Sequence, residues 1–201
     1  MLSLPFYVWL SRRTSKQTGY VTGALVWMMA MTLSFFITPD SPRFLPYLLA
    51  ASIGLGTGGI VGMMYSIFPD IPDVDELRTG QRREGIYFAL VTFARKVSSA
   101  LALFLVAQAI QLAGYIPPRM EVVEGLTRLV EQPQSPTFIL TLRLLFGLTP
   151  IFLLTIAILF ALRYPLNPQV HARLRAVLER KRAGESVDEA EILPLTRSLI
   201  G

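Results

Sequence analysis

Residues 86–112 read IYFALVTFARKVSSALALFLVAQAIQL, and this stretch decides the fold. A helix of about 20 predominantly apolar residues spans the hydrocarbon core of a membrane, so the stretch predicts a transmembrane helix. Arg95 and Lys96 nevertheless stand near its centre, where a charge is most costly. The sequence therefore predicts a membrane protein in which a cation at the bilayer centre has a structural or functional role.

Three further stretches are long and apolar enough to cross a membrane, namely residues 19–38, 45–68 and 138–162. The chain is 52% hydrophobic and only 16% charged, which is typical of a polytopic membrane protein. The first ten residues are apolar but too short to cross, and we interpret them as the end of a helix. The prediction is an all-α protein with four full transmembrane helices and one partial helix, in which residues 1–163 form the bundle.

The basic residues are concentrated in every second connection. Most of them lie in residues 11–18, in residues 70–84 and in the tail from Arg163 onward. The alternate connections contain only Arg43, Arg119 and Arg128. By the positive-inside rule, this asymmetry predicts a multi-pass protein of the inner or plasma membrane, with its basic loops and C-terminus in the cytoplasm. The net charge of +5 thus reflects orientation in the lipid bilayer, and we expect no nucleic-acid partner.

Lys96 lies about 16 Å inside its predicted helix, close to the midplane of the bilayer. Thr92 and Ser99 share its helical face, and such a polar stripe is expected to face a water-filled cavity. Arg143 is a further cation in the last stretch, nearer the outer surface. All 14 Asp and Glu residues lie outside the four stretches, so ions, the solute or a partner segment must supply the missing charge. The alternative is a structural role, in which backbone carbonyls and water satisfy Lys96 and Arg143.

No histidine, cysteine or acid lies within reach of this polar stripe to act as base or nucleophile, so we do not expect an enzyme. Zero cysteines exclude disulfides and thiolate metal sites, and we expect no metal and no bound cofactor. The only histidine, His171, lies in the tail and is interpreted as a solvated surface residue.

Residues 70–84 carry charges of both signs in dense alternation. A solvated loop is the simplest interpretation of such a run. The connection is short, however, and its charges adjoin two predicted membrane helices. The alternative is therefore a charge network at the cytoplasmic mouth, made by Asp70, Asp73, Asp75, Arg82, Arg83 and Glu84.

Small residues recur every four positions in the second stretch, at Gly54, Gly58 and Gly62. This spacing favours the close approach of another helix, and a flexible hinge is the alternative. The same segment satisfies the pattern G-x-G-x-x-G, but no strand precedes it, so we reject a dinucleotide site.

Two polar segments are expected to form surface helices. One lies around residues 120–130, within the connection 114–137. The other follows Asn167, a suitable N-cap, and Pro168, which fits the first helical position. In this second helix one face is apolar (Val170, Leu174, Val177 and Leu178), which predicts an amphipathic helix on the inner membrane surface. Residues 164–201 are thus expected to be a cytoplasmic amphipathic helix with a flexible tail.

Residues 70–87, DIPDVDELRTGQRREGIY, carry the pattern D-x-x-D-x-D-E followed by T-G-x-R-R-E-G. With Lys96, this pattern resembles the glycoside–pentoside–hexuronide:cation symporter family, the melibiose-permease-like branch of the major facilitator superfamily. Residues 5–16 and 164–166 resemble that family's loop between helices eight and nine and its C-terminal tail. The resemblance implies the end of helix eight through helix twelve, with the first seven helices not included.

The resemblance also implies roles for individual residues. Lys96 matches a lysine facing the binding site, Thr92 matches a sugar-side position, and the anions that pair with Lys96 belong to the absent transmembrane half. A coupling ion, sodium or proton, is expected in the complete transporter. Val91 and Val61 stand where melibiose-type members carry glutamine and tryptophan, which argues against a galactoside.

The function expected from these observations is that of the C-terminal part of a cation-coupled sugar or glycoside symporter, inactive alone. One alternative is a transporter of a lipid or other amphipathic metabolite on the same scaffold. The other is a membrane remnant or interaction subunit that does not transport.

Overall fold

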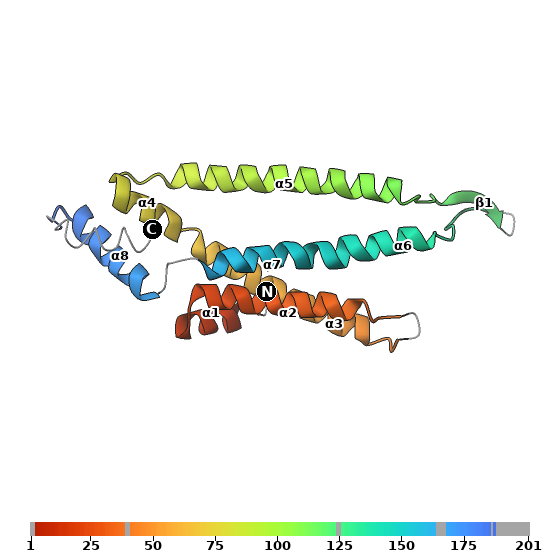
Figure 1. The fold of residues 1–201 in the computed structure, drawn as a ribbon, viewed down its shortest axis with the longest axis horizontal. Helices are drawn as coiled ribbons and strands as arrows, with labels where there is room; N and C mark the ends of the chain where they lie inside the picture. Colours follow the sequence, from red (N-terminus) through yellow and green to blue (C-terminus); the bar gives the residue numbers. More distant parts are fainter. Residues whose placement is uncertain (1–2, 39–40, 124–125, 164–167, 186, 188–201) are drawn as a thin grey trace. The chain divides into compact units, whose positions relative to one another are not determined.

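The computed structural model describes residues 3–38, 41–123, 126–163, 168–185 and 187 (Figure 1). The described chain is mostly helical, with one pair of short strands. Its elements are α1 (Leu4–Arg13), α2 (Lys16–Ser34), α3 (Leu45–Ile67), α4 (Asp70–Thr79), α5 (Glu84–Leu112), β1 (Arg119–Val123), β2 (Leu126–Val130), α6 (Pro136–Arg143), the π-helix η1 (Leu144–Leu148), α7 (Thr149–Leu162) and α8 (Pro168–Arg182).

Three helical stretches of the described chain are long and apolar enough to cross a membrane. They are Leu45–Leu77 (α3 and most of α4), Glu84–Leu112 (α5) and Pro136–Leu162 (α6, η1 and α7). The prediction of an all-α, multi-pass membrane protein is confirmed. The remaining predicted span, 19–38, forms helix α2, which is 19 residues long and is not among these three. Its sequence mixes small and hydroxylated residues with the apolar ones, which lowers its hydropathy.

The chain divides into two compact units, Met1–Thr92 with Leu153–Gly201, and Phe93–Phe152. In the first unit, α2 and α3 pack backbone against backbone. A Cβ atom added at Gly23 would lie only 2.8 Å from the Cα atom of Gly59. Gly56 faces Trp27 and the carbonyl of Gly23 in the same contact. Glycine is required at these positions because any side chain would force the two helices apart.

Helix α4 replaces the loop that we expected over residues 70–84. It is ten residues long and ends at Gly80, whose φ of 68° is the left-handed conformation typical of a residue after a helix. Its Leu77 is buried against Leu174, Val177 and Leu178 of α8. The amphipathic helix at Pro168 is thus present, but α4 covers its apolar face, which corrects the expectation that this face rests on the membrane. Asn167 and most of the tail lie outside the described residues.

In the second unit, residues 119–123 and 126–130 pair as the antiparallel strands of a hairpin, so the surface helix expected around residues 120–130 is wrong. Met120 pairs with Leu129 and Glu121 with Arg128 across the strands. Along β1, the charged Arg119 and Glu121 alternate with Met120, and successive residues of a strand lie on opposite faces. The amide of Gln134 exchanges two hydrogen bonds with the backbone of Ile116, at 3.1 and 2.8 Å, which ties the base of the hairpin together.

The last membrane-crossing helix is interrupted by η1. Its i→i−5 pattern is seen at Thr149, whose backbone N–H and hydroxyl both donate to the carbonyl of Leu144, the hydroxyl at 3.2 Å. The next residue is Pro150, which has no N–H to continue the regular ladder. The proline therefore accounts for a wider turn at this point.

Candidate functional site

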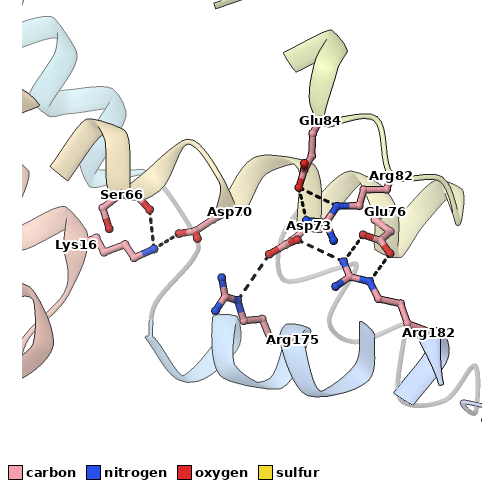
Figure 2. Close-up of polar contacts among 9 residues, drawn as sticks. All are labelled: Lys16, Ser66, Asp70, Asp73, Glu76, Arg82, Glu84, Arg175 and Arg182. Atoms are coloured by element: carbon pink, nitrogen blue, oxygen red, sulfur yellow. Dashed lines mark hydrogen bonds and ion pairs between the residues drawn. The ribbon is translucent and has the colours of Figure 1, made fainter. Parts of the chain in front are cut away.

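Acidic side chains of α4 form the centre of a charge network. Asp70, Asp73 and Glu76 recur every three residues and are 3%, 8% and 8% exposed. Residues at this spacing lie on one helical face. Burying three carboxylates is costly unless cations pair with them, and Figure 2 shows that cations from two other helices, α2 and α8, do so.

Lys16, at the start of α2, contacts the first of these carboxylates. Its ammonium group lies 2.6 Å from Asp70 and donates to the carbonyl of Ser66, on α3, at 2.7 Å (Figure 2). One cation thus satisfies an acid of α4 and the end of α3 together. This contact joins α2, α3 and α4 at one end of the first unit.

Helix α8 supplies the cations for the other two buried acids. Arg182 holds Glu76 through two donors on one edge of its guanidinium group, the Nε atom at 2.8 Å from Oε1 and the Nη2 atom on Oε2 (Figure 2). Arg182 and Arg175 also lie 3.7 and 3.8 Å from Asp73. The hydrogen bonds to Glu76 raise the pKa of Arg182 above its usual value, so this arginine stays charged. The middle and the C-terminal end of α8 are therefore fastened to α4 by charge as well as by apolar packing.

The turn after α4 contains two further pairs. Arg83 donates two hydrogen bonds to the carboxylate of Asp75, at 3.0 and 2.8 Å, and these bonds raise the pKa of Arg83. Arg82 pairs with Glu84, two residues away, through its Nε atom at 2.8 Å. Between this turn, α4 and α8 lies a polar cavity of about 150 Å³, lined by Asp73, Arg82, Glu84, Arg175, Glu179, Arg182, Pro69 and Leu178.

The structure brings all six predicted residues of the charge network into ion pairs, within the first unit. The sequence interpretation missed Lys16, Glu76, Arg175 and Arg182. Glu76 follows Asp73 at helical spacing, which was an available signal once α4 was recognised as a helix. The arginines of α8 gave none, because their contact with α4 spans about a hundred residues of chain. Nothing in this arrangement resembles a metal centre: the described residues contain no group of three suitable ligands.

The predicted cavity residues lie apart from this network in the chain. Thr92, Lys96 and Ser99 are exposed along α5, and Arg143 is exposed at the end of α6. Among the residues that the structure describes, Lys96 and Arg143 have no acidic partner. Helix α5 has no buried residue at all, so its polar stripe is uncovered along its length.

The glycine prediction needs a correction. A Cβ atom at Gly54 would have no neighbour within 4 Å, so this position packs against nothing in the described chain. At Gly58 and Gly62 the predicted close approach of another helix is present, because these glycines face Ser3 and Leu4 at the start of α1. The contact with α2 is made by Gly56 and Gly59. The predicted residues, which recur every four positions, lie on a different face of α3.

A sequence model described as MFS/sugar transport protein matches residues 1–168. The chain belongs to the MFS/sugar transport protein family. The match confirms the resemblance drawn from the motif in residues 70–87. The chain thus belongs to a family of multi-pass membrane transporters.

Three relatives of this MFS/sugar transport protein illustrate the range of the family. An uncharacterised symporter of Synechocystis sp. is 30% identical over 186 residues, which is 90% of this chain and 32% of the relative. A protein named "Putative sulfoquinovose importer", from Salmonella typhimurium, is 32% identical over 178 residues, covering 88% and 34%. Sodium-dependent lysophosphatidylcholine symporter 1 of Xenopus tropicalis is 24% identical over 200 residues, covering 98% and 35%. The chain spans about a third of the length of these relatives.

Proposed function

We propose that this chain supplies the C-terminal transmembrane part of a cation-coupled symporter for a sugar or glycoside. The observation that carries the proposal is the charge network, in which buried acids of α4 are held by cations from α2 and α8. Ion pairs between separate helices at one end of a bundle can close a passage and can open again without chemistry. The names of the Synechocystis and Salmonella relatives support symport and import of a sugar-like solute.

In this proposal the network is the cytoplasmic gate of an alternating-access cycle. Each partly exposed pair contributes only about 0–1 kcal/mol. Several pairs together amount to the few kcal/mol that separate two populated conformations of a protein. The binding energy of solute and ion is large enough to separate a few ion pairs of this strength. It would not be large enough to pull apart a large, fully buried apolar contact.

Lys96 and Thr92 would line the solute cavity, with Ser99 on the same stripe and Arg143 in the last span. The exposure of all four side chains supports this assignment, because another bundle is needed to cover them. That bundle would provide the acids that bind the coupling ion, sodium or proton, and that balance Lys96. The described residues leave Lys96 and its polar stripe uncovered, so we propose that the chain does not transport alone.

A second candidate is transport of a lipid or amphipathic metabolite on the same scaffold. The observation in its favour is the lysophosphatidylcholine symporter, which aligns with 98% of this chain. The two candidates differ in the solute that drives cation entry, so one experiment separates them.

The test is solute-driven cation uptake by proteoliposomes that contain the complete transporter including this chain. We expect sugars or glycosides to drive sodium or proton entry, and lysophospholipids not to. Cation entry driven by lysophospholipids alone would replace the first candidate with the second. No flux with either solute class, from correctly inserted protein, would favour a non-transporting subunit.

A further inference from the structure

The outward face of α1 exposes an aromatic pair next to two arginines. Phe6 and Trp9 are 52% and 49% exposed, and their rings stack with centroids 6.2 Å apart. The guanidinium carbon of Arg13 lies over the Trp9 ring, 4.6 Å from its centroid. Arg12 and Arg13 are the basic residues of the last helical turn. A phenylalanine, a tryptophan and a cation therefore follow one another along the surface of one short helix.

The opposite face of α1 holds the helix in place, so the outward direction of this surface is fixed. Tyr7 is 2% exposed and lies against Gly59 of α3. Leu4 lies against Gly62, and Ser3 against Gly58. Rotating α1 to hide Phe6 and Trp9 would break all three contacts.

The two arginines have no acidic partner among the residues that the structure describes. Lys16, a few residues further along, is paired with Asp70. A guanidinium that lies over an aromatic ring uses its flat face, and its five N–H donors remain available in the plane. These donors match the oxygens of a phosphate group, with which arginine forms bidentate pairs.

We propose that Arg12, Arg13 and Trp9 bind the phosphate of an anionic phospholipid, whose acyl chains cover Phe6. Trp side chains favour the level of the lipid headgroups, with the ring body toward the acyl chains. Arg12 and Arg13 belong to the basic segment 11–18, which the positive-inside rule places at the cytoplasmic surface of the bilayer, where anionic headgroups lie. Two unpaired cations complement a negative headgroup, whereas a zwitterionic headgroup carries its own compensating charge. Attraction to an anionic surface amounts to about fivefold in affinity for each basic residue.

The test uses the full chain with Trp27→Phe, so that Trp9 is the only tryptophan left. Nanodiscs contain phosphatidylcholine and phosphatidylglycerol in equal amounts, and one lipid at a time is brominated. Bromine quenches tryptophan fluorescence only on contact, so the two quenching values report which lipid lies beside Trp9. We expect brominated phosphatidylglycerol to be enriched several-fold over its bulk fraction. The double variant Arg12→Gln/Arg13→Gln should lose this enrichment.

The control variant Arg119→Gln/Arg128→Gln removes two charges from the hairpin and should keep the enrichment. Equal quenching by both lipids in the parent, or unchanged enrichment in Arg12→Gln/Arg13→Gln, overturns the proposal. If that variant fails to fold, a salt titration of the parent decides: the preference should fall as NaCl rises to 0.5 M, and salt-independent enrichment contradicts it. Millimolar inorganic phosphate should not displace the lipid, and displacement would identify a free-phosphate site instead.

Discussion

At the scale of single residues, one helix contact depends on the absence of side chains, and the proposed solute cavity depends on one positive charge. The contact between α2 and α3 depends on the missing side chains of Gly23, Gly56 and Gly59. The proposed solute cavity depends on the charge of Lys96. Both can be tested by substitutions that change one property.

Gly59→Ala should destabilise the protein by about 1–3 kcal/mol, because the added methyl group would meet the backbone of α2 and the ring of Tyr7. Gly54→Ala on the same helix has open space around it and should be neutral or slightly stabilising, since alanine favours helix by about 0.5–1 kcal/mol. Unfolding of the full chain in detergent micelles, followed by circular dichroism, measures both. Equal free energies of unfolding for the two variants would contradict the packing described above.

Lys96→Leu should abolish solute accumulation by the complete transporter, with a loss of at least tenfold. The same change removes a cation from the bilayer centre, which costs roughly 2.5–3.5 kcal/mol to insert, so the variant should be no less stable than the parent. Uptake assays and thermal unfolding are measured together. A purely structural lysine would give the opposite result, a less stable protein with uptake in proportion to folded material. Lys181→Leu, at an exposed position of α8, is the matched control.

At the scale of elements, α4 and α8 form a pair held by apolar packing and by charge. Leu174, Val177 and Leu178 are almost completely buried at this contact. Arg182 and Glu76 lie beside them. The apolar contacts provide the affinity between the helices, and the ion pairs set which residues face each other.

Arg182→Gln should loosen α8 from α4. Glu76 would remain a mostly buried carboxylate without its bidentate partner, although the partial exposure of Arg182 reduces the cost to about 1–2 kcal/mol. We therefore expect roughly tenfold faster hydrogen exchange of the backbone amides of α8. Lys181→Gln changes the same charge on the neighbouring residue and should leave exchange unchanged. Unaltered protection of α8 in Arg182→Gln would show that packing alone holds the helix.

Local sequence patterns predicted the presence of these helices, but they did not predict which elements the helices contact. The apolar residues of α8 at helical spacing identified the helix, and its start at Pro168 followed from proline's fixed φ. Its partner could not be predicted, because α4 and a membrane surface offer the same apolar environment to that face. The hairpin was missed because alternation over only five residues is a weak signal next to a predicted helix. The partners of Glu76 and Asp70 are non-local, and only folding brings them together.

At the scale of the whole molecule, the proposed gate and the proposed solute cavity can be tested together in a complete transporter that contains this chain. If the network is the cytoplasmic gate, weakening it should shift the transporter toward the state that is open to the cytoplasm. The stripe would then become more accessible to water from that side.

The natural chain contains no cysteine, so a single cysteine at Thr92 reports this shift without background. Glu76→Gln combined with Arg182→Gln should accelerate labelling of Thr92→Cys by a charged maleimide from the cytoplasmic side, by about tenfold. The pair Arg119→Gln and Arg128→Gln, which lies in the hairpin, should not. Slower or unchanged labelling would mean that the network stabilises the fold without gating.

The wide turn before Pro150 has a consequence for the phase of the last span. The π-helical turn between Leu144 and Leu148 contains one residue more than a turn of α-helix. Every later residue is therefore rotated about the helix axis by about 100° relative to a continuous α-helix. A single helical wheel drawn through this span misassigns its two halves, and the wheel has to restart at Thr149. Shortening residues 144–148 by one position would restore continuous periodicity and would turn Arg143 toward a different azimuth relative to α7.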